Sequence, residues 1–301
     1  MNFEFSEEQQ MLRDQARSYL TQHCPTTLVR RVLNNRESHD ADLYKGIAEM
    51  GWTATTIPEE YGGLGMSYLE LVVIAEELGR ACAPVPFSST VYLAAEAIMA
   101  LGTEAQKQAW LPKFADGTAI GCFAMGEAGG RVTPDQMSTR MQDGVLNGTK
   151  VPVADGGIAN VAIVVCASEK GDGATLALVD LSQDAVSKDN VQMIDFSRGH
   201  SELVFNGACA ETLGEEGAGW TAVESLMNTA AVLFAWEQIG IADKALEQAR
   251  EYALGRFAFG RSIASYQAIK HKLAKMYVKN TLARSNAYYG AWALNAQASD
   301  L

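Results

Sequence analysis

The sequence has few residues of the kinds that build metal centres or disulfide frameworks, and those it has are scattered. No two of its five cysteines form a CxxC pair, and its four histidines are isolated from one another. These residues are Cys24, Cys82, Cys122, Cys166, Cys209, His23, His39, His200 and His271. Their spacing argues against a zinc site, a set of disulfides or a catalytic triad. We therefore expect no metal site and a protein of the reducing cytoplasm.

Long apolar runs and an N-terminal targeting segment are also missing. No run approaches the ~18 apolar residues that indicate a membrane span, and residues 1–6 lack the basic and apolar regions of a signal peptide. The net charge of −12 argues against nucleic acid or an anionic membrane as the principal partner. It still allows a polyanionic ligand, because a local cluster of Lys and Arg can dominate one site.

The first 117 residues read as helices. Ser6 and Gln9 form a capping-box pattern at the start of one helix, and Thr103 and Gln106 repeat the pattern later. Apolar periodicity predicts further helices over 41–50, 68–78 (ended by Gly79) and 89–101. A chain of 301 residues is long enough for two or three units that share a large core.

The middle of the chain changes to short β-branched or alternating runs separated by turn residues. Strands are expected over 119–125, 138–142, 145–153, 161–167, 175–181, 191–196 and 201–205. Such short, closely spaced strands are typical of a small antiparallel barrel or sandwich. Two long helices follow, over about 220–254 and 265–296. The fold class is therefore α+β and multidomain, with an N-terminal all-α domain (1–118), a middle antiparallel β-barrel (119–213) and a C-terminal helical bundle (214–301).

The segment 51–87 joins a glycine-punctuated loop to a helix. It includes Gly51-Trp52, Ile57-Pro58-Glu59-Glu60-Tyr61-Gly62-Gly63-Leu64-Gly65, Glu76-Glu77-Leu78-Gly79-Arg80 and Ala83-Pro84-Val85-Pro86-Phe87. Spacing alone is compatible with a structural loop and helix of any all-α domain. As a whole, the segment resembles the N-terminal signature of the acyl-CoA dehydrogenase flavoproteins. The chain is similar to bacterial members that act on bulky or steroid-type acyl-CoA, some of which form mixed-subunit complexes.

The resemblance implies FAD as the cofactor and places its ring against two segments of the middle domain. Residues 126–131 stand where the family has a Thr-Glu-Pro-Gly-Ala-Gly-Ser-like loop, and residues 151–154 where it has a Trp-Ile-Thr-like strand. The expected cofactor contacts are Met125, Gly126, Gly129, Val153 and Ala154. The glycines permit close approach of the backbone, whereas the hydroxyls and the indole are absent and Pro152 removes a backbone donor. Arg131 either pairs with an anionic group or is simply solvated.

A second cofactor block lies between the two long helices. Arg256-Phe257-Ala258-Phe259-Gly260, with Gln267 downstream, resembles the family's Arg-x-x-Phe-Gly…Gln block. In the family these residues reach the FAD bound mainly by a neighbouring subunit, which implies cofactor roles for Arg256, Phe259 and Gln267. An arginine suits a pyrophosphate because its planar fork makes paired charge-assisted hydrogen bonds. The alternative for Arg256 alone is a cation that stabilises the macrodipole at a helix C-terminus.

The family's reaction removes a proton from the carbon α to a CoA thioester while hydride passes from the β carbon to the flavin. The proton needs a carboxylate whose basicity is raised by burial. Most members place it near the C-terminus, beyond the end of this chain, and a minority place it at the equivalent of Ala230. Glu237, about two helical turns further on, is the candidate here, with a structural or solvated role as the alternative and Glu224 as a weaker choice. The resemblance assigns Asn228 and Arg131 to substrate binding.

Two hypotheses of different classes follow. The first is a FAD-dependent acyl-CoA dehydrogenase, or a subunit of one, that forms a 2-enoyl-CoA and passes electrons to an electron-transfer flavoprotein. The second is a non-catalytic family member that completes a partner's FAD site and holds the assembly together. A helical scaffold unrelated to flavin is the third. Only two helices of the C-terminal bundle are present, and their apolar faces need a cover, so either the chain is a fragment or a partner supplies the missing helices. We expect a homo- or hetero-oligomer, either a dimer or a tetramer.

Overall fold

The structure is a computed structural model that describes residues 4–130, 132–168, 170–296 and 298. N-terminal helices, a middle sheet and C-terminal helices follow one another and confirm the α+β fold class. Contacts divide the chain into two compact units: a helical unit (residues 1–26, 67–83 and 231–301) and a sheet unit (residues 27–66 and 84–230). The domain boundaries expected from the sequence follow changes of secondary structure, and they stay a prediction.

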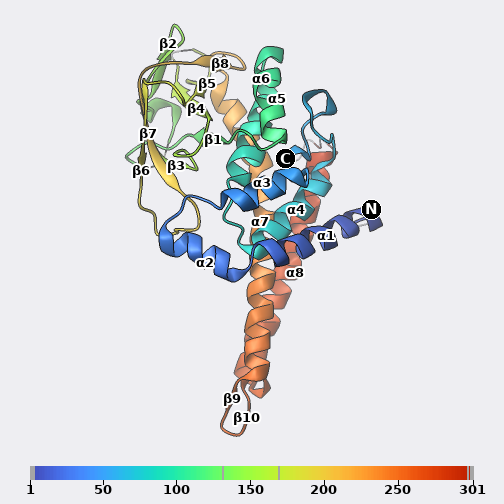
Figure 1. Cartoon of the computed structure of the whole chain (residues 1–301). Coiled ribbons are helices and arrows are strands. Elements are labelled where there is room, and N and C mark those ends of the chain that lie inside the picture. The colour runs from blue at the N-terminus through green and yellow to red at the C-terminus, as the bar shows by residue number, and fades with distance from the viewer. Residues whose placement is uncertain (1–3, 131, 169, 297, 299–301) are drawn as a thin grey trace. The chain divides into compact units, whose positions relative to one another are not determined.

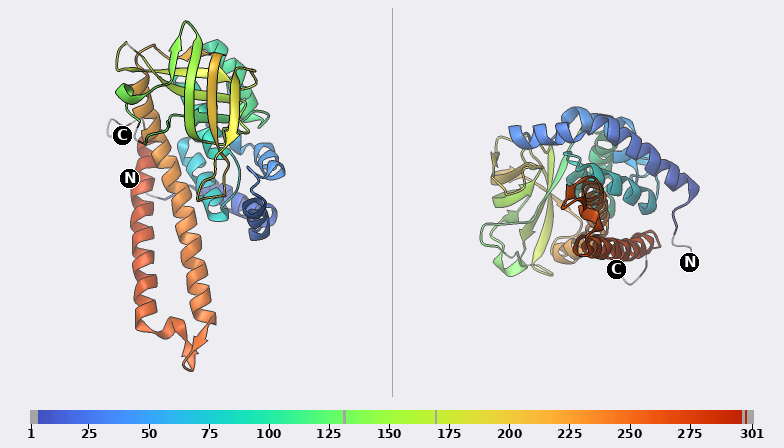
Figure 2. Two further views of the ribbon diagram at one scale, coloured as in Figure 1. Left: turned by 90° about the vertical axis from the view of Figure 1, so that its left-hand side faces the viewer. Right: turned by 90° about the horizontal axis from the view of Figure 1, so that it is seen from below.

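The helical unit is built on four long elements, and Figure 1 shows their course. They are α1 (Glu7–His23), α4 (Tyr68–Ala81), α7 (Gly219–Gly255, which enters this unit at Ala231) and α8 (Gln267–Asn295). The connection from α7 to α8 consists of β9 (Phe257–Ala258), β10 (Arg261–Ser262) and η5 (Ile263–Ser265). Within this unit, α7 and α8 lie side by side and extend beyond α1 and α4 to that connection (Figures 1 and 2). The capping box at Ser6 and both long C-terminal helices are confirmed.

Gly79 does not end α4, so the helix end predicted there is wrong. The helix continues to Ala81, and Cys82 follows in the left-handed region with φ 50°. Gly79 instead lies where α4 crosses α7, because a Cβ added there would lie 2.1 Å from the carbonyl oxygen of Glu237. A Cβ at Gly240 would lie 1.9 Å from the carbonyl oxygen of Glu76. The two glycines therefore permit a close approach of the two backbones.

Glu76 is buried in the helical unit and joins its helices through charged hydrogen bonds. Arg284 of α8 donates to its carboxylate at 2.9 and 2.7 Å, and Arg13 of α1 donates at 3.2 Å. Arg284 also donates to Asp243 of α7 at 2.5 Å. Burial opposes the charge of Arg284, but Glu76 and Asp243 outweigh it and raise the pKa of Arg284 above its usual value.

The sheet unit begins with short helices, and the sequence predicts α3, η3, α5 and α6 among them. They are α2 (Thr26–Asn35), α3 (Ala41–Glu49), η1 (Trp52–Ala54), η2 (Glu59–Tyr61), η3 (Ser88–Ala95), α5 (Glu96–Leu101), α6 (Glu104–Ala115) and η4 (Pro134–Gln136). The helix over 41–50 and the capping box at Thr103 are confirmed. The helix expected over 89–101 is divided into the π-helical η3 and α5. The sequence patterns missed α2, whose buried face has only two residues, Val29 and Val32.

The strands of the sheet unit form one mixed sheet (Figure 2). The strands are β1 (Gly121–Ala124), β2 (Arg140–Gln142), β3 (Val145–Ala154), β4 (Val161–Ala167), β5 (Ala174–Asp180), β6 (Val186–Asn190), β7 (His200–Cys209) and β8 (Glu211–Leu213). Among the described residues the hydrogen-bonded path runs β6-β7-β3-β2-β4-β5-β8 without closing, and β1 pairs with β4. Because β1 and β2 both run parallel to β4, the purely antiparallel barrel is wrong in this detail. The strand predicted over 191–196 is also wrong, since β6 ends at Asn190.

The core of the sheet unit lies on both faces of β4. Val161, Ile163 and Val165 pack with buried helical residues that include Leu111 and Phe114. The alternate residues Ala162, Val164 and Cys166 pack with residues of other strands that include Leu146 and Phe205. Every residue of β4 is buried, which explains its uninterrupted apolar sequence.

Candidate cofactor site

The two segments expected to meet the flavin ring lie together in the sheet unit. The amide of Val151 donates to the carbonyl of Gly126 at 2.9 Å. Lys150 of β3 donates from Nζ to the carbonyl of Met125 at 3.1 Å and to the carboxylate of Glu127 at 2.8 Å. The loop that follows β1 is thus fastened directly to β3, at the place where the resemblance predicts a ring.

Glu127 and Lys150 form a buried ion pair at the base of this loop. The side chain of Lys150 is fully buried and that of Glu127 is 11% exposed. Burial alone would raise the pKa of Glu127, but hydrogen bonds from Lys150, Ser138 and Thr139 outweigh it and lower the pKa to about 2. Burial lowers the pKa of Lys150, while its hydrogen bond to Glu127 opposes that shift. The two side chains are therefore tightly coupled, and their hydrogen bonds hold the base of the loop that follows β1.

The expected ring contacts offer backbone rather than side-chain groups. A Cβ at Gly126 would lie 2.9 Å from the carbonyl oxygen of Val151, so this close approach requires glycine. The side chain of Val153 is fully buried in the core, which leaves only its backbone for a ligand. Ala154 is half-buried, and Gly129 is exposed with φ 129°. Arg131 lies outside the described residues.

Unused backbone donors are the observation that fits a flavin ring here. Within the part of the chain that the structure describes, the amide N–H groups of Gly126 and Glu127 donate to no acceptor. Both residues are half-buried, and the loop beyond them, from Ala128 to Gly130, is exposed. The segment can therefore meet the polar edge of a planar ring through its backbone, but no hydroxyl at position 126 or 154 adds to that contact.

The turn between α7 and α8 presents the second predicted set in the helical unit. Phe259 is 98% exposed with φ 53°, and Gln267 is exposed at the first position of α8. Arg256 is exposed, and its guanidinium has no hydrogen-bond or ion-pair partner among the described residues. Its backbone is fixed, since its N–H donates to Tyr252 and its carbonyl accepts from Ile263, both at 2.8 Å. Because its backbone is fixed and its side chain is exposed, Arg256 can bind an anionic group of another molecule.

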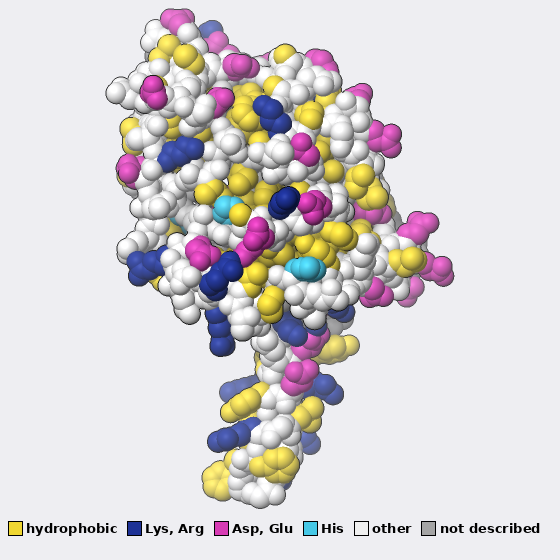
Figure 3. Space-filling model, in the orientation of Figure 1, with side chains coloured by type: hydrophobic (Ala, Val, Ile, Leu, Met, Phe, Trp, Pro, Cys, Tyr) yellow, Lys and Arg dark blue, Asp and Glu magenta, His cyan; other side chains and the backbone are white. Residues whose placement is uncertain are grey.

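The surroundings of this turn are apolar and basic. Exposed aromatic and aliphatic side chains follow α7 and α8 toward the turn, and lysines and arginines lie among them (Figure 3). The exposed apolar residues are Tyr252, Leu254, Phe257, Phe259, Met276, Tyr277, Val278 and Leu282. Such a surface is typical of an association site.

The proposed base and substrate residues lie elsewhere on α7. Glu237 is half-buried in the helical unit, with its backbone against Gly79. It precedes Arg256 by roughly 28 Å along the helix at 1.5 Å per residue. Asn228 is exposed on the part of α7 that belongs to the sheet unit, and Ala230 there is buried. A reaction centre that used both Glu237 and Arg256 therefore needs them from two copies of the helix.

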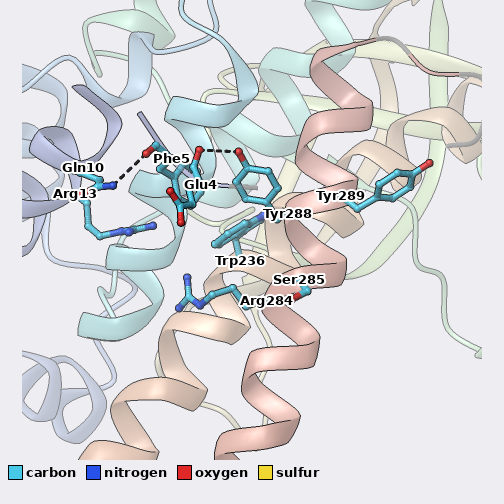
Figure 4. A pocket seen from close by; sticks show the side chains of 9 residues that line it. All are labelled: Glu4, Phe5, Gln10, Arg13, Trp236, Arg284, Ser285, Tyr288 and Tyr289. Atoms are coloured by element: carbon cyan, nitrogen blue, oxygen red, sulfur yellow. Dashed lines mark hydrogen bonds between the residues drawn. The ribbon is translucent and has the colours of Figure 1, made fainter. Parts of the chain in front are cut away.

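Two cavities among the described residues contain no site residue predicted from the sequence. The cavity in the helical unit has a volume of about 640 Å³ and is lined by aromatic and arginine side chains that include Phe5, Trp236 and Tyr288 (Figure 4). The cavity in the sheet unit has a volume of about 420 Å³ and includes Asp155 and Arg198. None of the described helices is both long and apolar enough to cross a membrane.

Sequence reasoning missed Lys150 and Glu127. The signal was present in β3, where Leu146, Gly148 and Lys150 alternate toward one face and a lysine interrupts the buried positions. A lysine at such a position needs a carboxylate nearby, and Glu127 supplies it from the loop after β1.

Comparison with known proteins finds similarity over most of the chain. The models for the N-terminal and C-terminal domains of acyl-CoA dehydrogenase match residues 6–118 and 217–300. Acryloyl-CoA reductase (NADH) of Anaerotignum propionicum is 30% identical over 97% of this chain and 77% of its own length. Short-chain specific acyl-CoA dehydrogenase of Megasphaera elsdenii is 30% identical over 97% of this chain and 80% of its own length. The solved structure of butyryl-CoA dehydrogenase from Megasphaera elsdenii is similar with a TM-score of 0.89 and 27% identity, over 99% of this chain and 82% of that one.

Proposed function

We propose that this chain, which belongs to the acyl-CoA dehydrogenase family, serves FAD-dependent α,β-dehydrogenation of an acyl-CoA thioester to the 2-enoyl-CoA across a subunit boundary. FAD is the cofactor of this family, and when bound it accepts the hydride from the β carbon. The observation that carries the proposal is the exposed turn at Arg256 and Phe259, followed by Gln267 at the start of α8.

Arg256 would bind the pyrophosphate of a FAD held mainly by a neighbouring subunit. Its guanidinium is exposed and without a partner in the described chain, and charge-assisted hydrogen bonds to phosphate are among the strongest polar contacts. Phe259 would contact the cofactor beside it, and Gln267 would donate from the first turn of α8, where backbone N–H groups also favour an anion. This role implies a homo- or hetero-oligomer, because the turn would bind a FAD that another subunit holds.

Within the sheet unit, Met125, Gly126 and Gly129 would meet the ring through the backbone, together with the backbone of Val153 and Ala154. The unused amides of Gly126 and Glu127 support this role. Asn228 and Arg131 would bind the acyl-CoA. Glu237 remains the candidate for the carboxylate that accepts the α proton, since it is half-buried on the helix where some members carry their base.

The second candidate function is a non-catalytic subunit that completes a partner's FAD site. The buried side chain of Val153 and the lack of a side-chain donor on Pro152 and Ala154 favour it, because the ring contact then rests on backbone groups alone. Turnover of an acyl-CoA by the isolated protein with an electron acceptor would contradict this reading.

Electron-transfer flavoprotein is the expected acceptor of the complete enzyme. The five cysteines, none in a disulfide, are compatible with the reducing cytoplasm.

The experiment is to replace Arg256 by Gln and to measure flavin bound per chain in the protein purified with its natural partner. Removing a charge-assisted contact worth about 1.5–3 kcal/mol predicts a loss of FAD affinity of roughly 10- to 100-fold. Arg30→Gln is the control, because Arg30 is also exposed but lies on α2. Full flavin retention in the Arg256 variant, or protein that binds no flavin even with excess FAD and its partner, would contradict the proposal.

A further inference from the structure

We propose that Lys150 is a positioning residue for the cofactor ring, through its clamp on the carbonyl of Met125 and the carboxylate of Glu127. The inference rests on the proposed function and identifies what fixes the backbone that meets the ring. The clamp holds the amide N–H groups of Gly126 and Glu127 in one orientation. A cofactor bound there then meets donors that are already in place.

The first reason is that packing alone does not account for a lysine at this position. Lys150 faces the interior of the sheet unit with no exposed surface. Taking its charge out of water is costly, and apolar residues of similar size often replace a buried ion pair at no loss of stability. We therefore explain the lysine by the groups that it binds, the carbonyl of Met125 and the carboxylate of Glu127, rather than by a gain in stability.

The second reason is the geometry of the clamp. Lys150 Nζ binds Met125 and Glu127, the residues on either side of Gly126, at 3.1 and 2.8 Å. Gly126 between them accepts from the amide of Val151 at 2.9 Å. Its carbonyl is therefore directed to β3, and its own N–H is left for another acceptor.

The third reason is that the clamp closes the base of the whole loop. The carboxylate of Glu127 accepts from the amide and hydroxyl of Ser138, both at 2.7 Å, and from the amide of Thr139 at 3.0 Å. The loop between these points includes Gly129 and Gly130, whose φ angles of 129° and 102° are those of glycine. Ala128, Gly129 and Gly130 are exposed, while Val132 and Met137 further along pack against the core, so the position of the exposed part depends on the hydrogen bonds at its base.

The final reason is the chemistry of the site that remains. The positions that offer hydroxyl and indole groups in the family are occupied here by Gly126, Pro152 and Ala154. Backbone N–H groups are then the donors available to the ring, and a hydrogen bond loses strength steeply when its donor turns away. The orientation of this backbone therefore determines the affinity for the ring.

The test compares Lys150→Met, Lys150→Arg and a control, Lys188→Met, in the full-length protein with its natural partner. Lys188 is suitable because it also donates from the sheet to a backbone carbonyl, that of Ala159 at 2.7 Å, away from the loop. Two measurements are made: hydrogen exchange of the amides of Ser138, Thr139 and Val151, and FAD titration followed by flavin fluorescence. Lys150→Met should accelerate exchange at these amides and weaken FAD binding about tenfold. Lys150→Arg should restore most of both, and Lys188→Met should change neither.

Several outcomes decide the question. Unchanged exchange in Lys150→Met overturns the proposal, and so does faster exchange with wild-type FAD affinity, because the clamp would then be merely structural. If Lys150→Met does not fold, Ser138→Ala replaces it, since Ser138 is exposed and its loss removes one link of the clamp. It should then give a smaller change of the same kind, and no change in either measurement overturns the proposal. Loss of FAD in Arg256→Gln but not in Lys150→Met leaves the proposed function standing, whereas a wild-type protein that binds no FAD contradicts both.

Discussion

Replacing Glu76 by Ala should strongly destabilise the helical unit. Glu76 is 4% exposed and accepts from both Arg13 and Arg284, so its loss leaves two guanidinium groups without their shared carboxylate. Removing one member of a buried ion pair costs about 3–5 kcal/mol. Asp243 still binds Arg284 at 2.5 Å, which places the expected loss near the lower end, at about 3 kcal/mol. For a chain of 301 residues, the corresponding fall in melting temperature is roughly 5 °C.

The assay is urea and thermal unfolding followed by circular dichroism, with Glu49→Ala as the matched control. Glu49 pairs with Lys45 at 3.8 Å, and both side chains are more than two-thirds exposed. An exposed pair of this kind contributes about 0.5 kcal/mol or less. The reasoning is refuted if the two variants unfold within about 1 kcal/mol of each other. It is also refuted if 1 M salt abolishes their difference, because a buried pair is screened far less than an exposed one.

Three further changes test other parts of the account. Gly79→Ala should cost about 1–3 kcal/mol in urea unfolding, because the added Cβ would lie 2.1 Å from the carbonyl of Glu237 and force α4 from α7; a loss under 0.5 kcal/mol contradicts this packing. Because the pKa of Glu127 is lowered in the folded state, its carboxylate stabilises the fold above pH ~4.5, and about 3 kcal/mol of the free energy of unfolding should be lost as pH falls toward 2. An acid-unfolding curve that Glu127→Gln leaves unchanged would disprove this contribution. Glu237→Gln should lower acyl-CoA turnover at least about 100-fold with FAD retained, and unchanged turnover removes Glu237 as the base.

The sequence predicted the elements whose signals are local. The capping boxes at Ser6 and Thr103 depend on residues three positions apart, and both form as expected. The fully apolar β4 and the two long C-terminal helices also have strong periodic patterns, so their bounds were close. In each case the pattern that predicts the element lies within the segment itself.

Elements whose form depends on distant partners were predicted less well. Gly79 reads as a helix end, but the close crossing with α7 requires a glycine inside the helix. The parallel pairing of β1 with β4 joins segments about forty residues apart, and nothing in either strand specifies its direction. The buried pair of Lys150 and Glu127 likewise combines two segments that only the fold brings together.

The candidate site divides in the same way. The block from Arg256 to Gln267 was found from its resemblance to the family's motif, and its side chains at 256, 259 and 267 are exposed on a turn whose backbone is hydrogen-bonded. The roles of Glu237, Asn228 and Arg131 depend on where other chains and the substrate lie, so they stay predictions.

The most direct measurement is an experimental structure of the purified assembly with FAD bound. The account predicts a nitrogen of the Arg256 guanidinium within about 3.2 Å of a pyrophosphate oxygen of a FAD that is held mainly by a different subunit. A loaded assembly in which this guanidinium points into solvent, remote from every flavin, would contradict it.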